Sequence, residues 1–245
     1  GDIQCAATTV ETWVVWNANG VATTQIFQLD KSYGADGMVV KPAIGSIKDL
    51  KGKTMAADAP GTATYFTLAW MLKKNGLSIK DVKVVNLSPQ AAANAMIAGN
   101  TDIDGGMTYE PFLSAVRAKP EAGKIIATTL DYPMVMDTFG CTPKFLADNP
   151  KAAQGLANGY FEALEMIAKE PKKSFEIMGA YVKQSAEAFE GSQKYLRWQD
   201  KAANQKFFAG EHAAFSKEAA DLLLEAGIIK QIPDLTKLAD TRFIK

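Results

Sequence analysis

Short apolar runs alternate with amphipathic stretches in residues 50–111, which is the pattern of alternating strands and helices. The predicted elements are a strand over 53–57, a helix over 65–74, a strand over 82–87, a helix over 90–98 and a strand over 101–107. Thr62 or Thr64 can cap the first helix, and Gly76 and Gly99 follow the two helix ends. The order β-α-β-α-β is the unit of a parallel sheet, whose ligands bind beyond the carboxyl ends of the strands. The sequence therefore predicts an α/β fold with a binding site at two polar turns, around Thr62 and around Glu110.

Four motifs follow one another along this stretch: DLKGK at 49–53, GTAT at 61–64, AMIAGNTDI at 95–103 and YEP at 109–111. Their order resembles the second lobe of periplasmic solute-binding proteins of ABC importers, in the branch that takes nitrate, sulfonates, taurine and thiamine precursors. The stretch TPKFLADNPKAAQGLANGYFEALEMI at 142–167 resembles a strand and a long helix of the same family. The resemblance implies a type II periplasmic-binding-protein fold, in which two parallel-sheet lobes are joined by two crossing strands. It also implies a periplasmic location and an ABC permease as partner.

The resemblance gives the domain organisation as well. Lobe one is expected at 1–41 and 133–245, and lobe two at 42–132. The first crossing between lobes is expected at 38–41 and the second at 137–140, after residues 134–136. The last third of the chain is expected to be helical, with one of its helices over 195–208, ahead of a short tail at 234–243.

Residues 1–11 echo residues 101–110, because both begin with an Asp-Ile strand and continue through small residues to Thr and Glu. In the family that the chain resembles, a β-α-β-α segment precedes this strand. The resemblance implies that lobe one lacks its first strands here and that a fused or companion segment supplies them. A fragment, a permuted or fused chain, and the binding part of an engineered sensor all fit this expectation, as does the absence of a signal sequence.

Composition excludes several classes of protein. With 27 basic and 27 acidic residues the chain has no formal net charge, which argues against a general nucleic-acid or anionic-membrane surface. No run approaches the roughly 18 apolar residues of a membrane span. The only cysteines, Cys5 and Cys141, fall on strands that the resemblance makes neighbours, so a disulfide is conceivable in an oxidising periplasm. Because cross-strand disulfides are strained, we expect two buried free thiols instead.

Motifs of enzymes are absent. The chain has a single histidine, His212, and it lacks a nucleophile elbow, a Walker loop and a zinc-protease motif. We therefore expect no enzyme, no catalytic residue, no cofactor and no metal, and we take His212 for a surface residue or a hydrogen-bonded one. An enzyme on the same fold, or a pyrimidine-binding protein, is the alternative.

The polar turns predict the charge of the ligand. A helix that begins near Thr62 favours an anionic group, and a carboxylate at Glu110, beside the ring of Tyr109, favours an ammonium group. A small zwitterion satisfies both, so we expect an amino acid or amino-sulfonate similar to γ-aminobutyrate or taurine. The alternatives at these positions are helix capping for the polar residues and core packing for the aromatic ones. The full set of expected ligand-binding residues is Thr8, Thr9, Glu11, Asp36, Thr62, Ala63, Thr64, Tyr109, Glu110, Asp137, Thr138, Phe139 and Trp198.

Overall fold

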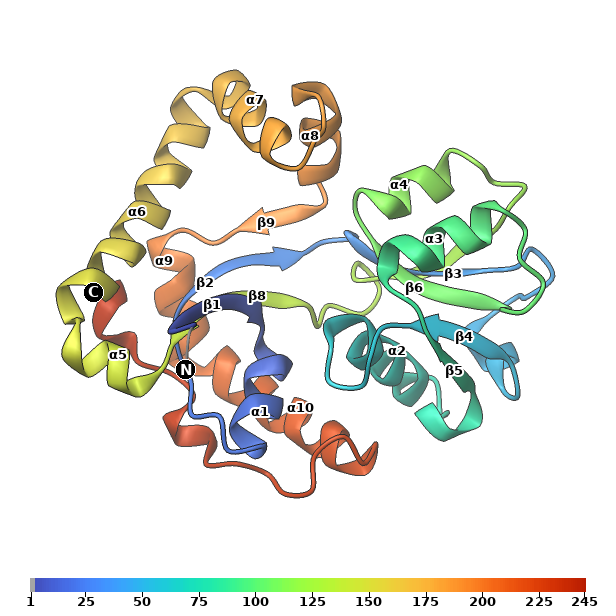
Figure 1. Cartoon of the computed structure of the whole chain (residues 1–245), viewed down its shortest axis with the longest axis horizontal. Coiled ribbons are helices and arrows are strands. Elements are labelled where there is room, and N and C mark those ends of the chain that lie inside the picture. The colour runs from blue at the N-terminus through green and yellow to red at the C-terminus, as the bar shows by residue number, and fades with distance from the viewer. Residues whose placement is uncertain (1–2) are drawn as a thin grey trace. The chain divides into compact units, whose positions relative to one another are not determined.

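Two β-sheets organise residues 3–245, the part of the chain that a computed structural model describes. Each sheet belongs to its own unit of the chain (Figure 1). Unit 1 contains the chain up to Lys31 together with Met136–Lys217 and Pro233–Lys245, and unit 2 contains Ser32–Val135 and Glu218–Ile232. The chain thus leaves unit 1 after Lys31 and returns to it at Met136.

The sheet of unit 1 has four strands in the order β1-β8-β2-β9. Their bounds are Cys5–Thr9 for β1, Thr24–Ser32 for β2, Met136–Cys141 for β8 and Leu196–Trp198 for β9. Strand β8 runs antiparallel to both β1 and β2. Because β1 is the last strand in this order, its outer edge carries no partner strand among residues 3–245.

Helices surround this sheet, and aromatic rings fill the space against one of its faces. The helices are α1 (Val10–Ala18), α5 (Pro143–Asp148), α6 (Pro150–Lys169), α7 (Pro171–Tyr181), α8 (Ala186–Gln193), α9 (Lys201–Lys206), a π-helical turn (Phe207–Glu211) and α10 (His212–Glu225), whose second half belongs to unit 2. The ring of Phe27 stacks on those of Phe139 and Tyr160, with centroids 5.1 Å apart in each case. The expected tail does pack on unit 1, because Ala239 forms a bridge with Gln25 of β2.

The sheet of unit 2 has five strands in the order β5-β4-β6-β3-β7. Its elements are β3 (Asp36–Val40), β4 (Thr54–Ala57), α2 (Ala63–Lys74), β5 (Lys83–Asn86), α3 (Pro89–Ile97), β6 (Gly105–Tyr109), α4 (Phe112–Arg117) and β7 (Lys124–Thr128). Strands β5, β4 and β6 are parallel, whereas β3 is antiparallel to both β6 and β7. At the centre, a Cβ on Gly105 would lie 2.5 Å from the carbonyl oxygen of Val39, so β6 and β3 approach each other closely only because this residue is glycine.

The predicted β-α-β-α-β unit and the α/β class are confirmed, with differences in detail. Neither sheet is purely parallel: the sheet of unit 2 is mixed, and in the sheet of unit 1 strand β8 is antiparallel to both β1 and β2. The third strand of the β-α-β-α-β segment starts at Gly105 rather than at residue 101. The residues before it make other hydrogen bonds: the amide of Asp102 donates to the side chain of Asn100, and the carboxylate of Asp104 accepts from the amide of Thr54. The predicted helix over 195–208 is wrong in its first half, where Leu196–Trp198 form β9.

The division into units also differs from the predicted lobes. Residues 38–41 were expected at the first crossing, but residues 36–40 form β3 between β6 and β7 and therefore belong to the second sheet. Residues 137–140, which we expected at the second crossing, lie in β8, just after the chain returns to unit 1 at Met136. The predicted strand at the start of the chain is observed as β1 from Cys5, whereas its first residue, Asp2, lies outside the described residues.

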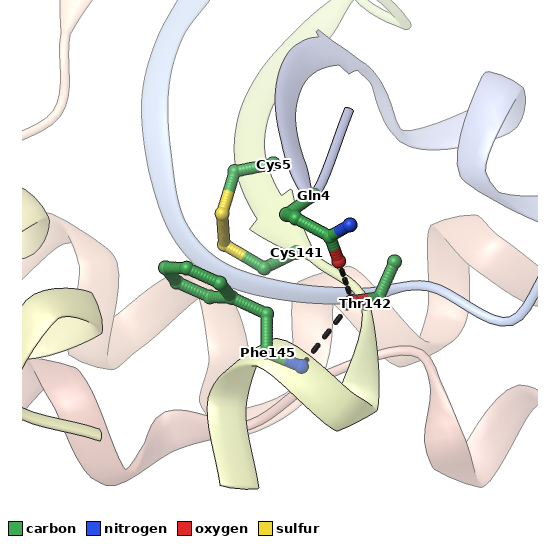
Figure 2. Close-up of a disulfide and its surroundings, with 5 residues drawn as sticks. All are labelled: Gln4, Cys5, Cys141, Thr142 and Phe145. Atoms are coloured by element: carbon green, nitrogen blue, oxygen red, sulfur yellow. Dashed lines mark hydrogen bonds between the residues drawn. A yellow bond between two sulfur atoms is a disulfide. The ribbon is translucent and has the colours of Figure 1, made fainter. Parts of the chain in front are cut away.

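The expectation of two free thiols is wrong, since Cys5 and Cys141 form a disulfide (Figure 2). The antiparallel register of β1 and β8 makes the two residues direct partners, and their Cα atoms are 4.0 Å apart. Beside them the side chain of Thr142, the N-cap residue of α5, donates to that of Gln4 and accepts from the amide of Phe145 in the first turn of this helix. The predicted adjacency of the two cysteine strands is thereby confirmed.

Candidate functional site

The two polar turns of unit 2 lie at one edge of its sheet. Strands β4 and β6 are neighbours and run parallel, with Met55 opposite Gly105 and Ala56 opposite Gly106. The turn after β4 leads to Thr62, and β6 ends at Tyr109, directly before Glu110. Both turns therefore occupy the carboxyl edge of the sheet, where ligands of open α/β sheets bind.

The first of these turns presents the start of α2. Thr62 is the N-cap residue, yet its hydroxyl donates to the carbonyl of Ala59 at 2.8 Å and makes no capping bond to the helix. The hydroxyl of Thr64 is buried and accepts from the amide of Asp58 at 3.2 Å. Neither threonine hydroxyl therefore caps the first turn of α2. The positive end of the helix dipole, at Ala63, favours an anion at this position.

The second turn holds an ion pair. Arg117, the last residue of α4, donates from Nη1 to Oε1 of Glu110, and the amide of Ser114 donates to Oε2 at 3.1 Å. The side chain of Glu110 is only 6% exposed, whereas that of Arg117 is 28% exposed. Arg117 also donates from Nη2 to the carbonyl of Gly34 at 3.2 Å. Both oxygens of the Glu110 carboxylate thus have protein partners.

A second carboxylate lies beside this pair. Asp36 begins β3 and pairs in register with Tyr109, and its own side chain is buried. Burial raises the pKa of Asp36 to about 6, the negative charge of Glu110 adds to the rise, and a hydrogen bond from the side chain of Ser32 opposes it. A buried carboxylate with a raised pKa at the edge of a sheet is typical of a functional site.

The chain around Asp36 is held by a network of hydroxyl groups. The hydroxyls of Ser32 and Thr129 lie 2.6 Å apart, and that of Thr129 accepts from the amide of Gly34 at 2.9 Å. The amide of Asp36 donates to the hydroxyl of Ser32 at 3.2 Å. This network fixes the turn over residues 32–36, against which Arg117 also binds. Tyr109, the register partner of Asp36, is 38% exposed, and the centroid of its ring lies 6.0 Å from that of Phe112.

In unit 1 the expected residues at the end of β1 bond to one another. The hydroxyl of Thr9 donates to the carboxylate of Glu11 at 2.5 Å and lies 3.0 Å from the hydroxyl of Thr12. All three side chains are buried at the start of α1. Thr8, the neighbour of Thr9, contributes its carbonyl oxygen, which accepts from the indole of Trp13 at 3.3 Å.

The remaining residues of unit 1 have structural partners. Thr138 is fully buried; it accepts from the indole of Trp13 at 2.7 Å and donates to the side chain of Gln25 at 2.9 Å. Phe139 belongs to the aromatic stack described above, so the core-packing alternative holds for it. The indole of Trp198 donates to the side chain of Gln193 at 3.3 Å, and Asp137 pairs in register with Thr9.

The structure thus brings the expected residues together in two groups. In unit 2 the sheet edge gathers Asp36, Thr62, Ala63, Thr64, Tyr109 and Glu110. In unit 1 the ends of β1 and β8 gather Thr8, Thr9, Glu11, Asp137 and Thr138. Sequence reasoning missed Arg117, Ser32 and Thr129. Arg117 could have been found from the sequence, because Ser114 and Arg117 follow Glu110 by four and seven residues, which is the spacing of one face of a helix.

His212 is buried, and one of its two ring nitrogens has no hydrogen-bond partner. Its side chain is buried against the rings of Phe207 and Phe208, and Nε2 has no hydrogen-bond partner. Burial lowers the pKa of His212 to about 4. Among residues 3–245 no cluster of His, Cys, Asp and Glu is arranged to hold a metal ion. Within the same range, no helix combines the length and the apolar character of a membrane span.

Comparisons with known proteins agree with the predicted family. A model of the NMT1-like family matches residues 4–179, more than half of the chain. The taurine-binding periplasmic protein of Escherichia coli K12 is 28% identical over 152 residues, which are 60% of this chain and 46% of that protein. The chain therefore spans about half the length of the curated relatives it matches.

Solved structures share the fold. The alkanesulfonate-binding protein SsuA from Xanthomonas axonopodis pv. citri, bound to MOPS, matches with a TM-score of 0.81 and 17% identity, covering 98% of this chain and 81% of that one. The desulfurization enzyme DSZB matches with a TM-score of 0.69 and 13% identity, covering 99% of this chain and 85% of that one. The fold is therefore that of the periplasmic binding proteins, and it serves both binding proteins and an enzyme.

Proposed function

Because the chain belongs to the NMT1-like family, we propose that it is the solute-binding component of an ABC importer and captures a small amino-sulfonate such as taurine. The names of its relatives support a sulfonate: one binds taurine and another binds alkanesulfonates. γ-Aminobutyrate, which has the same charge pattern with a carboxylate in place of the sulfonate, is the second candidate ligand.

The observation that carries this proposal is the start of α2. A sulfonate is a compact anion with three acceptor oxygens, and the first turn of a helix offers amide donors together with a partial positive charge. Here the side chain of the N-cap residue Thr62 turns back to Ala59, so it does not compete with an anion for these donors.

The ammonium end of the ligand is assigned to the acidic corner formed by Asp36 and Glu110. Glu110 is paired with the guanidinium of Arg117 and Asp36 lies beside this pair, so the three groups carry a net charge of −1 when both acids are ionised. A purely anionic ligand is repelled by this excess, whereas an ammonium group compensates it. Tyr109, half-exposed beside the pair, offers its ring to the same cation.

A periplasmic location is part of the proposal. Both cysteines of the chain are engaged in the disulfide of unit 1, and structural disulfides persist in oxidising compartments. The proposal also includes hinge closure on the ligand and its delivery to a membrane permease.

The test is calorimetric titration of the wild type and two proline variants with taurine, γ-aminobutyrate, ethanesulfonate and nitrate. Proline at the first position of a helix removes one amide donor and keeps the helix, provided that the preceding residue is extended. Thr62 meets this condition, with φ −93° and ψ 162°. Ala63→Pro therefore removes a single proposed donor to the sulfonate, and we expect taurine affinity to fall by about 5- to 20-fold.

The matched control is Ala186→Pro, the same change at the first position of α8, where Ser185 is extended as well. This variant should bind taurine as the wild type does. Glu110→Gln should weaken taurine by about tenfold or more, because it removes negative charge from the ammonium end. Tight binding of nitrate or ethanesulfonate that is insensitive to both Ala63→Pro and Glu110→Gln would refute the proposal.

The likeness to DSZB favours an enzyme as the second candidate. The disulfide leaves neither of the two cysteines as a free thiol, so a cysteine nucleophile requires reduction. Incubating the reduced and the oxidised protein with a bound sulfonate or sulfinate, and measuring released sulfite by ion chromatography, separates the two functions. Sulfite release in either state would support the enzyme.

A further inference from the structure

The Glu110–Arg117 ion pair is more elaborate than helix capping requires. Capping of α4 uses one oxygen of Glu110, which accepts from the amide of Ser114. The other oxygen accepts a hydrogen bond from Arg117. The guanidinium of Arg117 also donates to the carbonyl of Gly34 in the turn before β3. Arg117 thus connects the end of α4 to the turn that carries Asp36.

This connection places one positive charge against two negative ones. Asp36 is electrostatically coupled to Glu110, because the charge of Glu110 contributes to its raised pKa. Arg117 neutralises Glu110 directly and leaves Asp36 as the carboxylate without an ion-pair partner among the described basic side chains. Removing the guanidinium changes the net charge of the three groups from −1 to −2, and removing the charge of Glu110 changes it to 0.

We propose that Arg117 is a specificity-determining residue, which sets how strongly the site prefers a sulfonate that carries an ammonium group over one that does not. The inference rests on the proposed function, because it deepens the role of the acidic corner at the same site. Arg117 does not hold the sulfonate; it acts through Glu110 and Asp36 on the other end of the ligand. Its partial exposure means that water screens it less completely than a surface residue, so its charge reaches the ligand site.

The ratio of two dissociation constants tests this role. Taurine and ethanesulfonate share the sulfonate and differ in the ammonium group, so a defect in sulfonate binding or in folding cancels in the ratio of ethanesulfonate to taurine constants. Arg117→Gln should raise this ratio by about tenfold, and Glu110→Gln should lower it by a similar factor. The double variant restores a net charge of −1 and should return the ratio to the wild-type value.

A control removes the same charge elsewhere. Arg242→Gln breaks the ion pair with Asp240 in unit 1 and should leave the ratio unchanged. Equal losses of affinity for both ligands in Arg117→Gln would show that Arg117 is structural or holds the sulfonate, and the inference would be overturned. If the wild type binds neither ligand, the proposed function fails.

The pKa of Asp36 in the ligand-free protein gives an independent readout. It is measured by carbon-13 NMR of the side-chain carboxyl group as a function of pH. Arg117→Gln exposes Asp36 to the full charge of Glu110 and should raise its pKa above 6, whereas Glu110→Gln should lower it, each by about half a unit or more. An Asp36 pKa that moves in neither variant overturns the inference even when no sulfonate binds.

Discussion

Cys5 and Cys141 are direct partners in the antiparallel pair of β1 and β8, and a disulfide joins them (Figure 2). The two cysteines are 136 positions apart in the sequence. The loop that they close contains the whole of residues 32–135, the main part of unit 2. The disulfide therefore joins the first two of the three chain segments that make up unit 1.

The first prediction concerns this disulfide. Replacing both residues, Cys5→Ala with Cys141→Ala, should lower the free energy of unfolding by roughly 2–5 kcal/mol, since closure of so long a loop restricts the unfolded chain. Urea unfolding followed by circular dichroism measures the loss. Reductant should destabilise the wild type and leave the double variant unchanged. Equal stability of the two proteins without reductant would contradict the structural role.

The second prediction concerns Asp36. Its folded pKa of about 6 lies above the ordinary value of 3.8, so between these values the folded state binds more protons than the unfolded state. The contribution of Asp36 is therefore unfavourable at pH 7, by roughly 3 kcal/mol at most, and the penalty disappears as the pH falls below 4.

Asp36→Asn should accordingly be more stable than the wild type at pH 7 and equally stable near pH 4. Unfolding free energies at several pH values between 4 and 8 provide the test. The same variant should bind taurine more weakly, because it loses a negative charge at the ammonium end. If the unfolding free energies of the two proteins change in parallel with pH, the pKa of the Asp36 carboxyl group is not raised by folding and the prediction is wrong.

The sequence predicted the local elements of unit 2 better than their partners. The helix at 65–74 and the strand at 53–57 were found within two residues, because periodicity and capping signals are local. Residues 38–41 were expected at the first crossing, whereas the pairing of β3 with β6 and β7 depends on contacts with residues about 70 and 90 positions later. No local pattern encodes such pairing, so the sequence did not predict that residues 36–40 belong to the second sheet.

The candidate site shows the same limit. Glu110 was singled out because it follows a strand and precedes a helix, and that position is correct. Its environment was not predictable, since Arg117 reaches it from the far end of α4 and Gly34 comes from another part of the chain. A carboxylate that looked available to a ligand is therefore already paired in the structure.

The third prediction concerns His212. Its folded pKa of about 4 lies below the ordinary value of 6.5, so the unfolded state binds more protons between these values. The contribution of His212 to the free energy of unfolding should therefore decrease as the pH falls from 6.5 to 4, by roughly 3 kcal/mol at most. The direction is opposite to that of Asp36, and the two effects largely cancel in the wild type.

His212→Gln removes the titrating group and should abolish this decrease. The variant should gain stability relative to the wild type as the pH falls, and unfolding free energies at pH 4 and pH 7 measure the change. Asp36→Asn is the matched control, because its pH dependence relative to the wild type has the opposite sign. If the difference in unfolding free energy between His212→Gln and the wild type is the same at both pH values, the imidazole is hydrated and the prediction is wrong.

The last prediction concerns the outer edge of β1, which has no partner strand within residues 3–245. A pocket of about 310 Å³ is lined by residues of β1 and β8, including the disulfide, and by Ile3, Trp13, Trp16 and Val21. An unpaired strand next to exposed apolar surface is a template for pairing with another chain. We expect the isolated chain to self-associate as its concentration rises.

A lysine on an edge strand opposes such pairing. Ala7, exposed in the middle of β1, is the position for the change, and Ala213, exposed on α10, provides a control with the same added charge. Light scattering as a function of protein concentration should show less association for Ala7→Lys and wild-type behaviour for Ala213→Lys. Equal association of both lysine variants would place the contact elsewhere on the surface.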